Sequence, residues 1–571
     1  MSFFYNGRLW TSPAVMSRVD DSAMYNPNLN VGNVLAVIGT STGGEPNKAV
    51  PFGSAAEAAA YFKSGELVDG IAHAFDPSSE TAGPATVIGV RVNPAVRSTL
   101  SLLNASAAAV IALTSSDYGL YTGQIKVKIE SGAVAGKKLT TQFQNDVYTQ
   151  DNVHRNALSV AYSGAEETGV ITISNGSFVL QAPAGTTVAT IALATYPTIQ
   201  ELVDRINSVA DFSASVLDGN GAKPALNGLD SVTAQDVKTA AYTVKADLQA
   251  IVDWFNGIGS PIVSATREAG AGIVPANIPF TYLSGGSNGT VTNAEWSNAF
   301  TALQSVDVQW VAPVSADASI HAMADAHCSF MSNVGRMERR SICGTALTTS
   351  DANAIIAAKA LNSDRTSLVH LGFYDYDTSG ALVLYPPYIL AALIAGAFSG
   401  VNPGTALTNK SLKVRGLERD LKDPTDTDPL INGGVLCVKN TRTGYRVVQS
   451  ISTWLISDNF NRVEVSVGVA LDFTARNVRQ AVEGLKGAKG TPVSIALAAS
   501  KVETTLRELS KPEPVGPGVL AGDAENPPYK GISVQLEGDV LAIQFQCSPV
   551  IPINYIPVTI YAVPYSGSAS A

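Results

Sequence analysis

The stretch NVLAVIGTSTGGEPNKAVPFGSAAEAAAYF, residues 33–62, decides the fold class of the N-terminal part of this chain. Residues 34–38 are a short apolar run, which is typical of a buried strand, and a glycine-rich loop follows them. Ser54 is suited to cap a helix that Gly65 would end. A second apolar run at 85–93 predicts another strand. The order strand, helix, strand predicts a βαβ-like unit.

The glycine loop of this unit, GTSTGGEPN at 39–47, invites comparison with a phosphate-binding loop. Such a loop needs lysine and then serine or threonine after its last glycine, so that backbone amides and the lysine surround the phosphates. Glu45 and Pro46 stand at those positions here. Glutamate repels a phosphate and proline lacks an amide donor, so the sequence indicates a turn and no nucleotide site.

Strands and helices alternate again between about 280 and 400. The apolar runs predict strands at 306–314, 340–347 and 366–374 and helices at 315–337, 351–362 and 387–399. This order favours a mostly parallel, doubly wound sheet. Between 101 and 265 apolar and polar residues instead alternate around Gly and Asn-Gly turns, as they do in half-buried antiparallel strands.

The last third of the chain predicts a smaller mixed unit. A hairpin is expected within GGVLCVKNTRTGYRVVQSIST, which begins at residue 433. After it we expect a strand at 464–469, helices near 472–487 and at 492–509, and two strands at 532–536 and 540–547.

These patterns predict a multidomain chain of the α+β and α/β classes, with a doubly wound mixed sheet core, an inserted β-rich domain and extended N- and C-terminal arm strands. The expected parts are an N-terminal linker arm at 1–21, the first part of the α/β core at 22–100, the inserted β-rich domain at 101–265, an α/β middle domain at 266–402, a C-terminal core at 403–547 and a C-terminal arm at 548–571.

The composition argues against nucleic-acid binding and against membrane insertion. The formal net charge is −10 at pH 7, whereas a nucleic-acid binder shows a strong basic face. The most apolar segment, 384–403, has an uninterrupted part of only 388–398, which is shorter than the ~20 residues that a membrane-spanning helix needs. The four cysteines are far apart and favour reduced, buried thiols. They are Cys328, Cys343, Cys437 and Cys547.

Signals of catalysis are weak. The segment HAMADAHC at 321–328 holds two histidines, an aspartate and a cysteine, but it lacks the C-x-x-C or H-x-x-x-H spacing of zinc sites. His370 is expected within a strand and not at its end, and no G-x-S-x-G elbow is present. We therefore expect no enzyme activity and no cofactor. The competing interpretation is an α/β nucleotide-binding protein or hydrolase with its site at the strand ends of the 280–400 sheet.

A basic helix and turn stand out in this acidic protein. Arg476 and Arg479 are three residues apart and therefore share a helix face, and Lys486 and Lys489 follow in the turn. They form either an ordinary solvated face or a contact with an acidic partner surface.

The chain closes with CSPVIPINYIPVTIYAVPYSGSASA, residues 547–571. Four prolines punctuate this apolar run, and its cleanest strand pattern is Val558, Thr559, Ile560, Tyr561, Ala562 and Val563. The strand has no hairpin partner after it. It either folds back on its own sheet or pairs outside its own subunit.

Taken in order, these segments resemble the sheath protein of contractile phage tails. The resemblance begins with residues 33–62 and continues through DYGLYTGQIKVKI, YLSGGSNGTVTNAEWSNAFTALQSVDVQWVAP, LYPPYILAALIAGAFSG and GYRVVQSIST to the helix that starts at Asp472 and to SPVIPINYIPVTIYAV. The chain looks most like the sheaths of temperate-type myophages that carry an inserted outer domain. It departs from the family in its N-terminal arm, where Ser12-Pro13-Ala14 stands in place of a proline–glycine pair.

The resemblance implies strand exchange between subunits, in which both arms add strands to a small sheet of neighbouring subunits. The C-terminal arm agrees with this, because residues 549–565 can reach ~55 Å when extended. An unpaired apolar edge is an aggregation hazard, so a waiting acceptor is expected, and 532–536 with 540–547 would supply it by β-augmentation.

The resemblance also implies the partners and the location. Subunits would stack helically around a tail tube as a homo-oligomer, with baseplate and tail terminator proteins at the ends of the sheath. The particle would be a virion with a contractile tail, assembled in the host cytoplasm, or a phage-tail-like bacteriocin or injection particle. Residues 22–100 and 270–510 would form the inner and middle layers, and 101–265 would face outward. From its charge and its place near the C-terminal core, we hypothesise that the helix of Arg476 and Arg479, with Lys486 and Lys489 after it, touches the tube.

Overall fold

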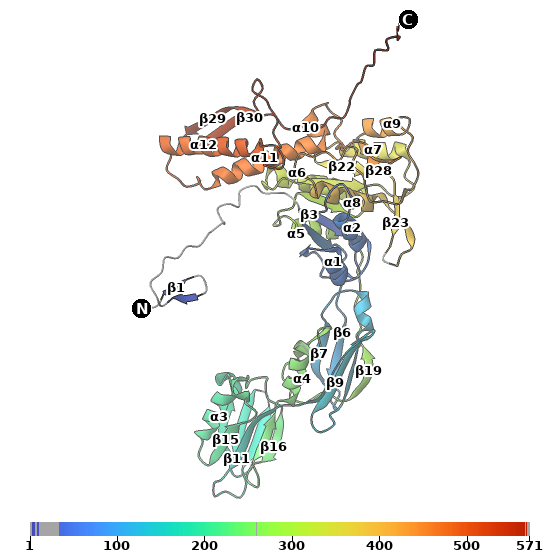
Figure 1. Cartoon of the computed structure of the whole chain (residues 1–571). Coiled ribbons are helices and arrows are strands. Elements are labelled where there is room, and N and C mark those ends of the chain that lie inside the picture. Colours follow the sequence, from blue (N-terminus) through green and yellow to red (C-terminus); the bar gives the residue numbers. More distant parts are fainter. Residues whose placement is uncertain are drawn as a thin grey trace.

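The computed structural model describes residues 34–565 apart from 175, 258, 259 and 378, together with residue 567 and the backbone of the two short strands β1 (Phe3–Tyr5) and β2 (Arg8–Trp10). Figure 1 shows a large α/β body from which two smaller units extend one after the other. The chain is therefore a mixed α/β multidomain protein with several sheets, as the sequence predicts. Apart from β1 and β2, the expected N-terminal arm at 1–21 lies outside the described residues.

The body is built on a seven-stranded sheet that is parallel except at one edge, where β4 runs antiparallel to β5. Its strands, in spatial order, are β26 (Val435–Leu436), β22 (Thr366–Val369), β21 (Arg340–Gly344), β20 (Trp310–Pro313), β3 (Val34–Gly39), β5 (Thr86–Arg91) and β4 (Ala49–Phe52). All five strands expected from the apolar runs of the two α/β segments contribute to this sheet, but the run at 366–374 is divided. Its first part is β22, and its last two residues begin β23 (Phe373–Tyr376), which belongs to a separate small sheet.

Helices cover both faces of the sheet, and β3 shows the division. Leu35 and Val37 pack into one core with α2 (Glu66–Phe75) and α8 (Pro387–Ser399), while Ala36 and Ile38 pack into a second core on the opposite face. Burial on both faces explains why these strands are continuous apolar runs. The remaining helices of the body are α1 (Ala55–Phe62), α5 (Asn293–Ala302), α6 (Ala318–Asn333), α7 (Asp351–Leu361) and α9 (Thr427–Asn432).

The segment between β5 and α5 forms the two smaller units, each with its own apolar core. The unit next to the body, the stalk, contains β6 (Thr99–Leu103), β7 (Ala109–Ser115), β8 (Lys126–Ser131), β9 (Lys137–Phe143), β10 (Asp146–Val153), α4 (Asp247–Asn256), β18 (Val263–Arg267) and β19 (Ile278–Tyr282). The distal unit, the tip, contains β11 (Asn156–Tyr162), β12 (Val170–Ser174), β13 (Ser177–Gln181), β14 (Thr187–Ala192), α3 (Ile199–Asn207), β15 (Phe212–Val216), β16 (Val232–Asp236) and β17 (Tyr242–Lys245).

Polar contacts fasten the tip to the stalk. Asp230 of the tip accepts hydrogen bonds at 2.9 and 3.0 Å from the backbone amides of Asp247 and Leu248, at the N-terminus of α4. Arg267 of β18 donates to the carbonyl oxygen of Leu229 at 2.8 Å. Burial raises the pKa of Asp230 to about 6, and the two amide hydrogen bonds oppose that shift.

This raised pKa predicts a pH dependence that Asp230→Asn should remove. Because the folded-state pKa lies above the ordinary value, the stability that Asp230 contributes is present in acid and is lost as the pH rises through about 6. Relative to the variant, the wild type should lose up to ~1.4 kcal/mol per pH unit between about pH 4 and 6 and nothing further above that range. Thermal unfolding of both proteins at pH 4.5, 5.5, 6.5 and 7.5 measures this difference. A difference that stays constant over these four values would contradict the assignment.

The C-terminal part packs a helix pair and a hairpin against the body. It comprises α10 (Phe460–Val463), α11 (Val465–Glu483), α12 (Pro492–Leu509), β29 (Tyr529–Glu537) and β30 (Val540–Cys547). The small sheets that precede it contain β23 (Phe373–Tyr376), β24 (Leu382–Tyr385), β25 (Gly416–Leu417), β27 (Val438–Thr441) and β28 (Gly444–Val447). The helix expected at 492–509 and the strands expected at 532–536 and 540–547 are confirmed.

The strand expected at 464–469 is wrong, because these residues begin α11. A short apolar run does not distinguish a strand from a buried helix by its period, and packing against the body decides here. Val465 and Val467 are each 1% exposed, and Gly468 lies directly against the guanidinium of Arg340.

Candidate assembly site

The C-terminal arm leaves the body after β30 and forms no helix or strand between 551 and 565 (Figure 1). Its apolar side chains are exposed, with Val558 at 76%, Ile560 at 86% and Val563 at 85%. The strand expected from Val558, Thr559, Ile560, Tyr561, Ala562 and Val563 is thus not formed within the single subunit, and its pairing with another subunit stays a prediction. Exposure of this much apolar surface on one segment is typical of an interaction site.

Among the residues of the arm that the structure describes, backbone hydrogen bonds hold only its root. Ser548 donates to the carbonyl oxygen of Pro528 at 2.9 Å, and Val550 donates to that of Val519 at 3.0 Å. Beyond them, the side chain of Asn554 donates to Glu464 at 2.7 Å.

The hairpin of β29 and β30 is the expected acceptor. Its two strands pair antiparallel from Tyr529 opposite Cys547 to Glu537 opposite Val540, with a bulge near Lys530. Ile543 and Phe545 face α12 and pack on the small core there. Within the described residues no third strand pairs with this sheet, so both of its outer edges keep backbone groups available.

A groove of about 770 Å³ lies between the hairpin and the turn that joins α11 to α12. Its apolar lining includes Val482, Leu485, Ile495, Leu536, Leu541 and Ile543. Its cationic lining consists of Arg336, Arg479, Lys486 and Lys489. Three of the four basic residues singled out in the sequence therefore lie together at the edge of the acceptor hairpin.

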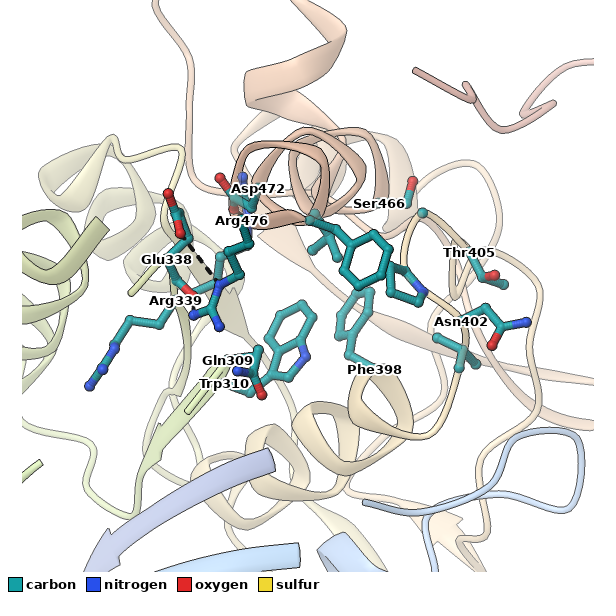
Figure 2. A pocket seen from close by; sticks show the side chains of 16 residues that line it. Gln309, Trp310, Glu338, Arg339, Phe398, Asn402, Thr405, Ser466, Asp472 and Arg476 are labelled. Carbon is teal, nitrogen blue, oxygen red and sulfur yellow. Dashed lines mark hydrogen bonds and ion pairs between the residues drawn. The ribbon is translucent and has the colours of Figure 1, made fainter. Parts of the chain in front are cut away.

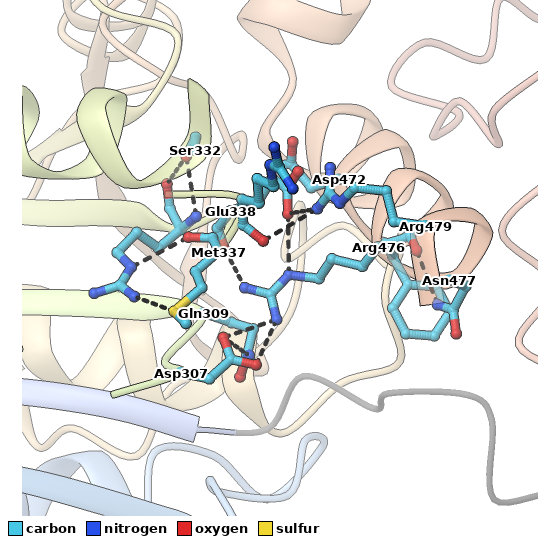
Figure 3. Close-up of polar contacts among 12 residues, drawn as sticks. Asp307, Gln309, Ser332, Met337, Glu338, Asp472, Arg476, Asn477 and Arg479 are labelled. Carbon is cyan, nitrogen blue, oxygen red and sulfur yellow. Dashed lines mark hydrogen bonds and ion pairs between the residues drawn. The ribbon is translucent and has the colours of Figure 1, made fainter. Parts of the chain in front are cut away.

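Arg476, the fourth, does not face solvent and so cannot belong to that groove. It is 9% exposed and pairs with Asp307 at 2.9 Å and with Glu338 at 3.4 Å, and it also donates to the backbone carbonyl of Glu338 (Figure 3). Arg479 pairs with the same Glu338 at 2.5 Å but remains 38% exposed. The two arginines share a helix face as expected, and that face is covered by the segments around Asp307 and Glu338.

A second ion network also fastens α11 to the body. Asp472 accepts from Arg340 at 3.1 Å and from Arg365 at 2.6 Å, and it is only 17% exposed. Burial lowers the pKa of Arg340, and the neighbouring Asp472 opposes that shift. Sequence patterns did not reveal either network, because the paired residues are more than 100 positions apart in the chain.

The cavity beside these networks is too small for a nucleotide (Figure 2). Its volume is about 40 Å³, close to the space that one or two waters occupy. The rings of Trp310 and Phe398 stack on one side with centroids 4.7 Å apart, and Phe473 of α11 lies near them. The cavity is a packing gap between α11 and the sheet.

The residues considered for metal binding are engaged elsewhere. His321 is hydrogen-bonded to the carbonyl oxygen of Ser315 at 2.9 Å, and His327 lies 3.0 Å from the guanidinium of Arg339. Burial and that guanidinium lower the pKa of His327 to about 4. Among the described residues, no group of three or more His, Cys, Asp or Glu is placed to hold a metal ion.

The glycine loop closes on its own chain. The Gly44 amide donates to Asp117 at 2.8 Å, and Arg91 donates to the Gly44 carbonyl oxygen at 2.7 Å. The Gly44 amide, which a bound phosphate would need as a donor, is thus already bonded to the carboxylate of Asp117. This agrees with the prediction that the loop is a turn and no nucleotide site.

His370 directly follows the last residue of β22, so the expectation that it lies within a strand is wrong. It lies 3.1 Å from Thr345 and 3.0 Å from Asp351, an order that resembles a nucleophilic triad. Thr345 is only 5% exposed, however, and none of the three lines the groove or the cavity described above. The geometry indicates a buried network that ties strand ends together.

Across the described residues no helix is both long and apolar enough to cross a bilayer. The apolar segment at 384–403 forms α8, which is buried in the body as expected.

No family model matches the chain. It is 29% identical over 585 residues to the tail sheath protein of Bacillus phage SP01, which covers 99% of this chain and 97% of that protein. It is 27% identical over 565 residues to a putative tail sheath protein of Enterococcus phage phiEF24C, which covers 95% of each. The solved sheath tail protein of Desulfitobacterium hafniense has the same fold, with a TM-score of 0.52 and 12% identity over 95% of this chain and 100% of that chain. The resemblance to phage tail sheath proteins is confirmed.

Proposed function

We propose that this chain is a structural subunit of a contractile tail sheath, which polymerises helically around a tail tube and contracts to drive the tube through the host envelope. Relatives named tail sheath proteins along nearly the whole chain support a structural and not an enzymatic role. These relatives do not favour the competing interpretation, in which the chain is an α/β nucleotide-binding protein or hydrolase. Because these relatives are phage tail sheath proteins, we infer that the chain is a component of the virion tail. We also propose that it assembles in the host cytoplasm.

The exposed segment 558–563 of the C-terminal arm, which pairs with no strand in the described part of the chain, carries this proposal. Residues 558–563 would add as a strand to the β29–β30 hairpin of a neighbouring subunit, where main-chain hydrogen bonds supply the affinity. The open edges of that hairpin and the 76–86% exposure of Val558, Ile560, Tyr561 and Val563 support the exchange. Electron microscopy of the purified protein, with and without the arm, tests it.

Contraction would move subunits as nearly rigid bodies, with the arms as hinges. The two ion networks support this, because they hold α11 and therefore the hairpin firmly on the body. The free-energy difference between the extended and contracted lattices would drive the motion, with no cofactor and no hydrolysis.

The layer order in the sheath is proposed from the arrangement in Figure 1. The hairpin and the stalk and tip units lie on opposite sides of the body. This supports an assembly in which 22–100 and 270–510 form the inner and middle layers and the insertion at 101–265 faces outward.

The tube contact is proposed for Lys486 and Lys489, with Arg479 beside them. Lys486 has a side chain that is 63% exposed and pairs only with Glu483 three residues before it among the described ion pairs, and Lys489 is exposed in the same turn. Arg476 is left out of this contact because its charge is satisfied inside the subunit.

Charge reversal tests this contact. Lys486→Glu with Lys489→Glu should weaken co-assembly with tube particles at least tenfold at low salt, because two attractive charge contacts become repulsive. Lys63→Glu with Lys223→Glu makes the same charge change at exposed positions remote from α11 and should have little effect. Co-sedimentation of sheath with tube measures both. Equal binding by the two double variants would contradict the contact.

The same architecture also fits a phage-tail-like bacteriocin or another injection particle. In either particle, baseplate and terminator proteins would bound the sheath at its two ends.

A further inference from the structure

A buried carboxylate lies where the C-terminal arm leaves the body. Glu464 precedes α11 and is 1% exposed. Its Oε1 accepts hydrogen bonds from the side-chain amides of Gln449 at 2.6 Å and of Asn554 at 2.7 Å. Burial raises the pKa of Glu464, and the hydrogen bonds from Gln449 and Asn554 oppose that shift.

Among the described residues, the groups bonded to Glu464 are all neutral. Its second oxygen, Oε2, has no hydrogen-bond partner there, and neither has Oδ1 of Asn554. A buried carboxylate without a cationic partner destabilises the fold on its own account. The contact between Glu464 and the arm therefore offers a functional explanation for a carboxylate at this buried position.

Asn554 is the last residue of the arm that bonds to the body among the described residues. Val550 makes the last backbone bond before it, and Tyr555 directly after it is 82% exposed. Ile553 on its other side is 80% exposed. Between these two exposed side chains, the amide of Asn554 turns inward to a buried partner.

We propose that Glu464 is a positioning residue that anchors the root of the C-terminal arm through Asn554, so that the movable part of the arm begins at Tyr555. The proposal rests on the sheath function given above, since only an arm that reaches a neighbour needs a fixed origin.

The anchor sets the reach of the arm. Three residues, 555–557, separate Asn554 from the start of the expected strand and span on the order of 13 Å up to the Cα of Val558. The whole segment 555–563 spans ~30 Å, compared with ~50 Å for 549–563 in an arm that is free from 549 onward. The acceptor hairpin of the neighbour would thus have to begin close to Asn554 in both lattices.

Spin labels on the monomer test the anchor. A nitroxide is placed at Ile553→Cys, between the two points of attachment, or at Val558→Cys, beyond them, in a background with Cys547→Ser. The other three cysteines are buried. The label at 553 should move several-fold more slowly than the label at 558. Equal mobility at the two positions would overturn the anchor.

Matched charge variants identify Glu464 as the partner. Asn554→Asp places a second carboxylate against Glu464 and should make the label at 553 as mobile as the one at 558. Tyr555→Asp adds the same charge one residue later, on an exposed side chain, and should leave the label at 553 slow. Equal spectra from the two variants would overturn the assignment.

The monomer measurement separates this inference from the proposed function. Slow motion at 553 in a chain that never forms tubes would retain the anchor and reject the sheath. Tubes formed by a chain whose label at residue 553 is freely mobile would support the sheath and reject the anchor.

Discussion

Removal of residues 557–571 is expected to abolish helical polymerisation of the purified chain while leaving its fold intact. The cut falls beyond the backbone bond of Val550 and beyond the contact of Asn554 with Glu464, so the root of the arm stays on the body. It removes the segment 558–563, whose large apolar side chains are 76–86% exposed in the subunit, and with it every expected main-chain bond to a neighbouring hairpin. Sedimentation and electron microscopy measure polymer, and circular dichroism measures the fold.

A chain that ends at Tyr565 is the matched control for this truncation. It loses the final six residues but keeps the whole expected strand, and it should polymerise like the full chain. Tubes from the chain that ends at Ile556 would mean that the arm is dispensable and that other surfaces hold the polymer together.

The second large effect is expected from Asp472→Ala. This substitution leaves Arg340 and Arg365 without their shared carboxylate in a site where the side chain of Arg340 is 6% exposed. Breaking a buried pair by removing one partner costs ~3 kcal/mol or more, because the remaining charge is left uncompensated. For a cooperative unit of roughly 300 residues, about the size of the body with its C-terminal part, the thermal unfolding midpoint should fall by about 5 °C or more.

Glu483→Ala is the control on the same helix. It removes an exposed ion pair with Lys486, and the midpoint should stay within about 2 °C of the wild type. Differential scanning calorimetry compares the three proteins. Equal midpoints for Asp472→Ala and Glu483→Ala would show that Asp472 does not hold α11 on the body, and the rigid-body contraction would lose its support.

The central sheet was predictable because its strands are buried on both faces. Residues 34–38 are uniformly apolar, and the structure places Leu35 and Ala36 in different cores on the two sides of β3. The same argument failed at 464–469, where Val465 and Val467 alternate as in a strand but pack as the buried first turn of α11.

The candidate site was predictable only in its local features. Helical spacing correctly places Arg476 and Arg479 on one face, since both reach Glu338. Spacing carries no information about what covers that face, so the burial of Arg476 was missed. The contact of Glu464 with Asn554 joins positions 90 residues apart and leaves no periodic pattern.

A helical reconstruction by cryo-electron microscopy of polymers grown from the purified chain tests the strand exchange most directly. The expected result is an additional strand on the β29–β30 hairpin of each subunit, traced to residues 558–563 of a neighbouring subunit. A hairpin that remains two-stranded, with the arm folded on its own subunit, would contradict the exchange, and a chain that stays monomeric under all salt conditions would contradict the sheath itself.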